Sequence, residues 1–165
     1  MEKLQVLNEE LMDEDTQKDQ YLIFSIGEEF YGIEIKSVTE IIGIQNITQV
    51  PELPPYIKGI INLRGRIIPV MDVRTRFKKE AVAYNDRTCV IVVDFQSVSV
   101  GLIVDSVSEV LSIAEQDIVP PPEFVGSGSR YISGIGKVGS DVRLLINCDK
   151  LLNEEEAAEI AAISQ

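Results

Sequence analysis

The chain has 165 residues, of which 45% are hydrophobic, a proportion typical of globular proteins rather than disordered chains. Its formal net charge is −12, but residues 1–19 account for −5 and the tail from Leu152 accounts for −4, so the body carries −3. No apolar run reaches the ~18 residues that a membrane span needs, and no secretory signal opens the sequence. We therefore expect a cytoplasmic protein.

The first 19 residues predict an acidic, disordered tail. Three leucines in this segment, Leu4, Leu7 and Leu11, have the spacing of one helical face. Their apolar surface is too small to stabilise an isolated helix. Ordered structure is expected from about Gln20. Apolar alternation around a Gly27 turn then predicts a β-hairpin that ends near Ile35.

The segment Lys36–Ile42 is ambiguous. Val38 and Ile41 have helical spacing, whereas the β-branched residues of the segment favour a strand. Further on, Ile60–Ile68 predicts a second hairpin with Gly65 in its turn. The polar stretch 78–86 is expected to connect the two halves of the chain.

The second half repeats the strand pattern and then ends in a helix. Cys89–Phe95 is almost continuously apolar, as expected for a strand buried on both faces, and Val98–Val104 predicts its return partner. Asn153 followed by Glu156 is a capping signature. It predicts a C-terminal helix within residues 153–165.

The two halves are copies of one module. Tyr21–Ile44 aligns without a gap with Val90–Ile113, an offset of 69 residues, and Tyr56–Ile60 matches Tyr131–Ile135 after six extra residues. A repeat of this kind marks duplicated structural units. Two similar lobes suit a protein that holds partners together, although duplication also serves simply to enlarge a core.

Short strands at regular spacing with few helices predict an all-β fold built from small barrels. One barrel per copy places the first at about residues 20–84 and the second at about 85–152. The sequence leaves open whether strands are exchanged between them.

The residues of common catalytic and metal sites are missing. The chain has no histidine and no cysteine pair with metal-site spacing, and it lacks phosphate-loop and dinucleotide-binding motifs. Cys89 and Cys148 lie in hydrophobic segments and are expected to be buried, reduced thiols. We therefore predict no catalytic residues, no metal and no cofactor.

A rival interpretation rests on basic residues between positions 58 and 79. Seven Lys or Arg fall there, with Asp72 the only acid, and small barrels bind nucleic acid through such stripes. However, only Phe77 is available for base stacking, and the body is acidic overall. We therefore expect no nucleic-acid binding, and salt-sensitive binding to single strands would favour the rival.

Several motifs, in the same order, resemble the CheW family, the coupling adaptors of bacterial chemotaxis. The resemblance runs from about Gln20 to Leu152, and the motifs that carry it are Tyr31–Ile35, Val38–Ile41, Ile57–Gly65, Ile68–Arg74 and Gly101–Val110. It implies two SH3-like five-stranded barrels around a shared hydrophobic seam, and no catalysis. It also implies an adaptor that links chemoreceptor cytoplasmic tips to the regulatory domain of the chemotaxis histidine kinase within receptor arrays. Contact with the membrane would be indirect, through the receptors.

The resemblance assigns receptor binding to five residues: Val38, Glu40, Ile41, Lys58 and Arg64. Arg64 is expected at a hairpin tip, where a guanidinium can grip a carboxylate or backbone carbonyls, or simply remain solvated. Glu40 has a repeat mate in Glu109, so a folding role for this glutamate is also open. Apolar neighbours of Glu40 would meet an amphipathic receptor helix.

Kinase binding is assigned to Val119 and Phe124. Phe124 follows a proline-rich loop, where an aromatic residue serves either as an interface anchor or as loop packing. Val119 stands where some relatives carry an arginine, so an apolar contact is expected there rather than a salt bridge.

Overall fold

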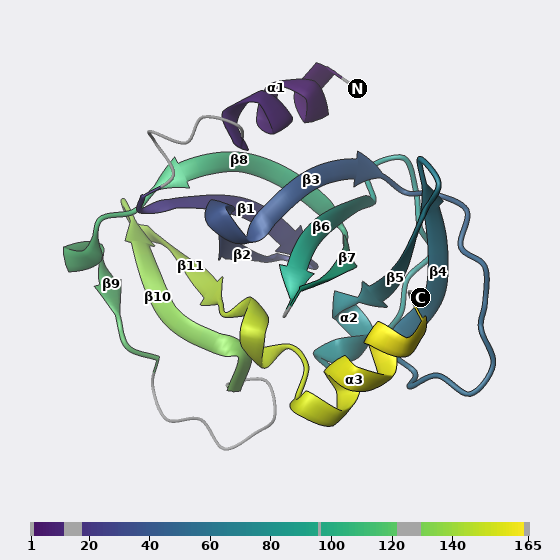
Figure 1. Ribbon diagram of the computed structural model, residues 1–165. Coiled ribbons are helices and arrows are strands. Elements are labelled where there is room, and N and C mark those ends of the chain that lie inside the picture. Colours follow the sequence, from purple (N-terminus) through teal and green to yellow (C-terminus); the bar gives the residue numbers. More distant parts are fainter. Residues whose placement is uncertain (1, 12–17, 96, 122–129, 164–165) are drawn as a thin grey trace.

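The computed structural model describes residues 2–11, 18–95, 97–121 and 130–163, and these residues form two β-sheets with short helices around them (Figure 1). The first sheet has the order β8-β1-β2-β11-β10-β9, with the strands β1 (Gln20–Ile26), β2 (Glu29–Glu34), β8 (Ser106–Ser112), β9 (Ile118–Val119), β10 (Ile132–Val138) and β11 (Asp141–Ile146). The second sheet has the order β3-β6-β7-β5-β4, with the strands β3 (Val38–Gly43), β4 (Ile57–Leu63), β5 (Arg66–Asp72), β6 (Cys89–Phe95) and β7 (Val98–Val104).

Short helical elements join or cover the sheets. The α-helices are α1 (Glu2–Leu11), α2 (Val73–Arg76) and α3 (Glu154–Ile163), and the 3₁₀ turns are η2 (Ile35–Ser37), η3 (Glu115–Asp117) and η5 (Cys148–Lys150). This architecture confirms the predicted all-β fold of two SH3-like barrels with a C-terminal helix. Within the described residues, no helix combines the length and apolar character needed to cross a membrane.

The sequence repeat is also a structural repeat. In the first sheet β1 pairs with β8 so that Leu22 faces Val110, and in the second sheet β6 pairs with β3 so that Ile91 faces Ile41. Ile91 lies 69 positions after Leu22, and Val110 lies 69 positions after Ile41, so the two pairs are equivalent in the repeat. The parallel pairs β2–β11 and β7–β5 correspond in the same way. The two barrels are therefore nearly equivalent in strand order and register.

The strands are exchanged between the two sequence copies, the alternative that the sequence left open, so each barrel draws strands from both 20–84 and 85–152. One sheet combines the hairpin β1–β2 of the first copy with β8–β11 of the second, and the other combines β6–β7 of the second copy with β3–β5 of the first. Equivalent strands carry the same apolar pattern and bury the same faces. The apolar pattern is therefore compatible with pairing within one copy and with pairing between copies. Exchange results because the chain passes from one sheet to the other after β2 and again after β7.

A β-bulge in β3 explains the ambiguous segment around Val38. The register against β6 shifts between Val38 and Glu40, which leaves Thr39 as the extra residue. The shift turns both Val38 and Ile41 toward the core, whereas strict alternation would have placed Val38 and Glu40 on the same face. The helical spacing of the two apolar residues thus arises within a strand.

One continuous core joins the two barrels. Its largest buried cluster draws side chains from both sheets and from α1 and α3. Four aromatic rings run through this seam, with neighbouring ring centroids 5.4–5.7 Å apart, in the order Phe24, Tyr31, Phe77 and Tyr131. Burial at this scale favours two barrels that fold as one unit.

Helix α1 corrects the prediction of a disordered N-terminal tail. Residues 2–11 are helical, and Leu7 and Leu11 are only 4% and 5% exposed because they pack into the inter-barrel core. The spacing of the leucines is visible in the sequence. The apolar surface against which they pack, however, is formed by strands that are distant in the chain. Tertiary packing supplies the stability that an isolated short helix lacks.

Helix α3 confirms the predicted capping motif. The Asn153 side chain accepts a hydrogen bond from the Glu156 amide at 2.8 Å, and the Glu156 carboxylate accepts one from the Asn153 amide at 2.9 Å. The same carboxylate bonds Arg76 at 2.9 Å and Tyr56. The cap therefore also fastens α3 to the seam.

Candidate functional site

Arg64 lies at the tip of the β4–β5 hairpin and projects into solvent. The two turn residues have φ angles of 52° at Arg64 and 86° at Gly65, as a two-residue type I′ turn requires. The Asn62 side chain accepts a hydrogen bond from the Gly65 amide at 2.8 Å, which holds the turn. The Arg64 side chain is 68% exposed, so it is available to a partner.

Glu40 forms an ion pair with Arg64. The bulge at Thr39 directs the Glu40 side chain outward from the edge strand β3, where it is 26% exposed and receives a hydrogen bond from the guanidinium. This hydrogen bond raises the pKa of Arg64. Two residues that the resemblance assigned to receptor binding, 24 positions apart in the chain, are therefore brought together.

The other three residues assigned to the same role are placed differently. Val38 and Ile41 are buried beneath the surface, on the inner face of β3. Lys58 is half-buried at a bulge of β4, beside Gly59. Within the described residues, no hydrogen bond or ion pair links Lys58 to the Glu40–Arg64 pair, so Lys58 is part of the neighbouring strand rather than of the pair.

Of the two residues assigned to kinase binding, only Val119 lies within the described residues, and it belongs to a different edge. Val119 lies in the short strand β9, is half-buried, and pairs with Ile135 at the edge of the six-stranded sheet. Phe124 lies outside the described residues. Val119 and the Glu40–Arg64 pair therefore belong to different sheets.

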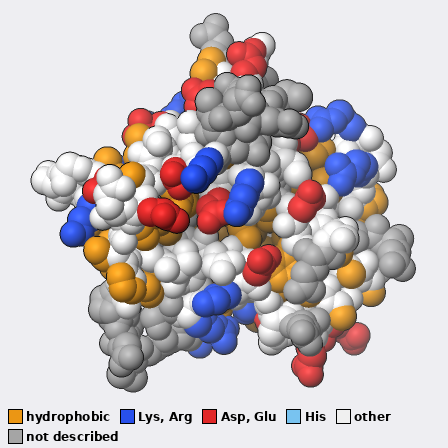
Figure 2. Space-filling view, turned by 60° about the vertical axis from the view of Figure 1, so that its left-hand side comes forward, with side chains coloured by type: hydrophobic (Ala, Val, Ile, Leu, Met, Phe, Trp, Pro, Cys, Tyr) orange, Lys and Arg blue, Asp and Glu red, His pale blue; other side chains and the backbone are white. Residues whose placement is uncertain are grey.

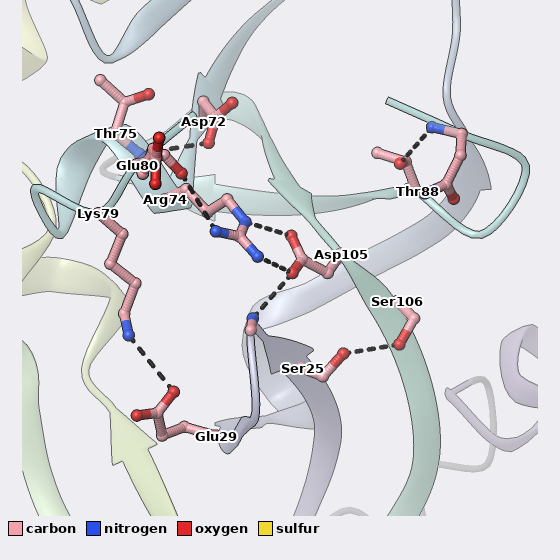
Figure 3. A network of polar contacts seen from close by, with 12 residues as sticks. Ser25, Glu29, Asp72, Arg74, Thr75, Lys79, Glu80, Thr88, Asp105 and Ser106 are labelled. Atoms are coloured by element: carbon pink, nitrogen blue, oxygen red, sulfur yellow. Dashed lines mark hydrogen bonds and ion pairs between the residues drawn. The ribbon is translucent and has the colours of Figure 1, made fainter. Parts of the chain in front are cut away.

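A polar network between the barrels was not assigned from the sequence. Arg74 grips Asp105 with two hydrogen bonds, from Nε at 2.8 Å and from Nη2 at 2.6 Å (Figure 3). The Gly27 amide also donates to Asp105, at 2.8 Å, from the hairpin turn of the other sheet. The hydrogen bond from Arg74 is the main cause that holds the pKa of Asp105 below its ordinary value.

This network fastens the two barrels together. Arg74 follows β5 of one sheet, and Asp105 lies between β7 and β8, where the chain crosses to the other sheet. Both residues fall within the motifs that carry the family resemblance, but their separation of 31 positions hides the contact from any local pattern.

The basic stripe proposed for nucleic acid is largely engaged within the protein. Arg74 is held by Asp105, Arg76 is buried against Glu156, and the remaining contacts of the stripe are Arg64 with Glu40, Arg66 with Ser99, and Lys79 with Glu29. On the face shown in Figure 2, acidic and basic side chains are mixed. A continuous cationic track for a phosphate backbone is therefore absent from the described part of this stripe.

Arg76 serves the seam instead. Its guanidinium carbon lies 4.1 Å from the ring centre of Tyr56 and 5.3 Å from that of Tyr131, which are equivalent positions of the repeat. Its Nε donates to the Leu151 carbonyl at 2.8 Å. Arg76 thus joins both copies of the module to the segment that leads into α3.

The two cysteines are buried and unpaired, as the sequence predicts. Burial is the main cause that raises the pKa of Cys148 to about 12 and also raises that of Cys89, so both thiols remain protonated and unreactive at neutral pH. Among the described residues, no group of three or more acidic or cysteine side chains is arranged to hold a metal ion.

Comparison with known proteins agrees with this architecture. The family model described as a CheW-like domain matches residues 20–156. The chain is 40% identical over 152 residues to Chemotaxis protein CheW of Klebsiella aerogenes, covering 92% of each chain. It is 31% identical over 147 residues to Chemotaxis protein CheW of Treponema pallidum, covering 86% of each.

A solved structure has the same fold. The scaffolding protein TtCheW from Thermoanaerobacter tengcongensis superimposes with a TM-score of 0.78 at 36% identity, covering 84% of this chain and 94% of that one. The motif order, the two barrels and these matches all agree, and the chain belongs to the CheW-like family.

Proposed function

We propose that this protein couples the cytoplasmic tips of chemoreceptors to the regulatory domain of the chemotaxis histidine kinase, and that it helps to build receptor arrays. Family membership makes the protein a non-catalytic adaptor of bacterial chemotaxis signalling. The proposal adds the two partners, a cytoplasmic location, and recruitment to the membrane through receptors alone. It includes no cofactor and no nucleic acid.

The observation that carries the receptor contact is the exposed pair of Glu40 and Arg64. The pair joins an edge strand to a defined turn, so both charged groups are held in place before a partner arrives. A receptor helix with acidic and amide side chains would exchange hydrogen bonds with this pair while its apolar stripe meets the inner residues of β3. Lys58 would add charge at the border of this contact.

The kinase contact is proposed at the six-stranded sheet. Val142 lies in the hairpin β10–β11 of this sheet and is 56% exposed. An exposed apolar side chain there suits barrel-to-barrel association with a domain of similar fold. Val119, in the edge strand β9 of the same sheet, would extend the contact, and Phe124 is assigned to it by the resemblance alone.

Calorimetric titration with the kinase regulatory domain and, separately, with a soluble receptor-tip fragment tests the proposal. Arg64→Glu should weaken receptor binding by about tenfold or more and leave kinase binding unchanged. Arg66→Glu is the matched control, with the same charge change on the same hairpin. If both variants bind the receptor fragment equally well, the role proposed for Arg64 is wrong. If neither partner binds the folded wild type, the proposed function fails.

A further inference from the structure

Helix α1 lies along the strand that carries the candidate receptor residues Val38, Glu40 and Ile41. It packs against β3 and β8, which are edge strands of the two different sheets (Figure 1). Leu7 and Leu11 belong to the same buried cluster as Val38 and Ile41. The edge of this strand is therefore occupied by a helix of the protein itself.

A carboxamide fastens this helix to the edge strand. Asn8 donates from Nδ2 to the Ile41 carbonyl at 3.0 Å and accepts at Oδ1 from the Ile41 amide at 2.9 Å. The free edge of a sheet leaves such backbone groups unpaired unless something covers them. Only a primary amide side chain supplies donor and acceptor together in this geometry. The edge of β3 is thus built to receive a helix that carries Asn or Gln within its apolar stripe.

A depression with a mixed lining lies beside the helix. It has a volume of 390 Å³ and is lined by the apolar Leu4 of the helix and Val107 of β8, by Gly43 of β3, and by charged residues such as Asp86 and Arg87. An incoming helix can therefore contact both edge strands before α1 has left. Replacement of α1 by an incoming helix can therefore begin at this depression.

The attachment of α1 is small enough to be reversible. The helix has ten residues, below the length at which helices are stable alone, and its packing includes the buried Leu7 and Leu11, the partly buried Leu4 and the Asn8 side chain. Its outer face is polar apart from Val6, which is 53% exposed. Short terminal elements with few buried contacts open at a lower free energy than the core does.

We propose that α1 is an intramolecular occupant of the receptor groove, which covers β3 and β8 in the free protein and is displaced when a receptor helix binds. This inference rests on the receptor contact proposed above. The partner it predicts is an amphipathic helix with a carboxamide between two apolar residues. Only the molecules in which α1 is detached can bind the receptor helix. The measured affinity therefore equals the affinity of the open site multiplied by the fraction of molecules that are open.

The test releases α1 in the full-length chain. Leu7→Asp places a charge in the apolar seam, and Val6→Asp makes the same change on the exposed side of the same helix. Calorimetric titration with a soluble receptor-tip fragment should show about tenfold tighter binding for Leu7→Asp and unchanged binding for Val6→Asp. The affinity for the kinase regulatory domain should be the same in all three proteins.

A second measurement needs no variant. In the wild type, amide hydrogen exchange of residues 4–11 should accelerate when the receptor fragment binds, because the displaced helix loses its protection. Receptor binding that leaves this segment protected, or Leu7→Asp binding no more tightly than the wild type, would overturn the displacement of α1. If the fragment binds neither protein, the receptor contact itself fails, and the inference fails with it.

Discussion

Glu40 and Arg64 form an ion pair between opposite ends of the strand order of one sheet, with Glu40 on the bulged edge strand β3 and Arg64 at the tip of the β4–β5 hairpin. Each position depends on an irregularity of the backbone. The bulge at Thr39 directs the carboxylate outward, and a left-handed φ of 52° presents the guanidinium. An arginine in a left-handed turn position is disfavoured relative to asparagine or glycine, so the geometry of the turn does not require an arginine there.

This argument predicts opposite effects of Arg64→Asn on stability and on binding. Asn-Gly is the preferred pair for a type I′ turn, so the variant should have a melting temperature equal to or above that of the wild type. Its receptor affinity should fall, because the guanidinium is lost. Differential scanning calorimetry and receptor titration check the two effects, and a lower melting temperature would show that Arg64 stabilises the fold.

A second prediction concerns the close packing of β7 at Gly101. A Cβ placed there would lie 2.6 Å from Val90 Cγ1 and 3.0 Å from Val70 Cγ1, so Gly101→Ala should lower the free energy of unfolding by about 1–3 kcal/mol. Gly43→Ala is the control, because a Cβ at Gly43 would meet no heavy atom within 4 Å. Urea unfolding should separate the two variants. Equal stabilities would contradict the packing described at Gly101.

The third prediction concerns Asp105 and pH. Its pKa is lowered in the folded protein, chiefly by the hydrogen bond from Arg74, so the unfolded chain binds more protons near pH 4. The stabilisation is therefore present above the unfolded pKa and is lost as the pH falls through the folded pKa. Asp105→Asn should lower the free energy of unfolding by about 1–2 kcal/mol at neutral pH, a modest value because the pair is partly exposed.

Urea unfolding at several pH values measures this difference. The gap between Asp105→Asn and the wild type should begin to narrow below about pH 4, where the unfolded chain takes up its proton, and should close at lower pH as the folded carboxylate is protonated. Asp94→Asn, at an exposed carboxylate, should stay within about 0.5 kcal/mol of the wild type. A gap that is constant down to acid pH would rule out the Arg74 ion pair as its source.

The fourth prediction concerns the attachment of α3. Arg76→Met keeps the apolar stem but removes the hydrogen bonds that Arg76 donates to the Leu151 carbonyl and to the Glu156 carboxylate. The carboxylate keeps its bonds to Tyr56 and the Asn153 amide. The free energy of unfolding should fall by about 2–4 kcal/mol, and amide exchange in α3 should accelerate. Arg87→Met, at an exposed arginine, should change neither. Unaltered protection of α3 in Arg76→Met would contradict this role for Arg76.

Local patterns in the sequence predicted the local elements well. The Asn153 and Glu156 cap and the turn at Gly65 depend on neighbouring residues alone, and both are present. The repeat predicted two equivalent barrels for the same reason, since each copy carries its own strand pattern.

Features that depend on distant segments were missed or left open. The helix carrying Leu7 and Leu11 forms on a surface supplied by β3 and β8, and the Arg74–Asp105 clamp joins residues 31 positions apart. Strand exchange also depends on distant segments. The sequence could not predict it, because equivalent strands can pair within one copy or between the two copies. In the candidate site, the resemblance supplied Glu40 and Arg64 as separate residues, and only the fold shows that they form one pair.

Sedimentation of the protein with the kinase regulatory domain and a receptor-tip fragment together tests the central claim most directly. An adaptor with separate surfaces for its two partners should form a ternary complex that neither partner forms without it. Displacement of one partner by the other, or the absence of any complex with all three proteins folded, would contradict the adaptor account.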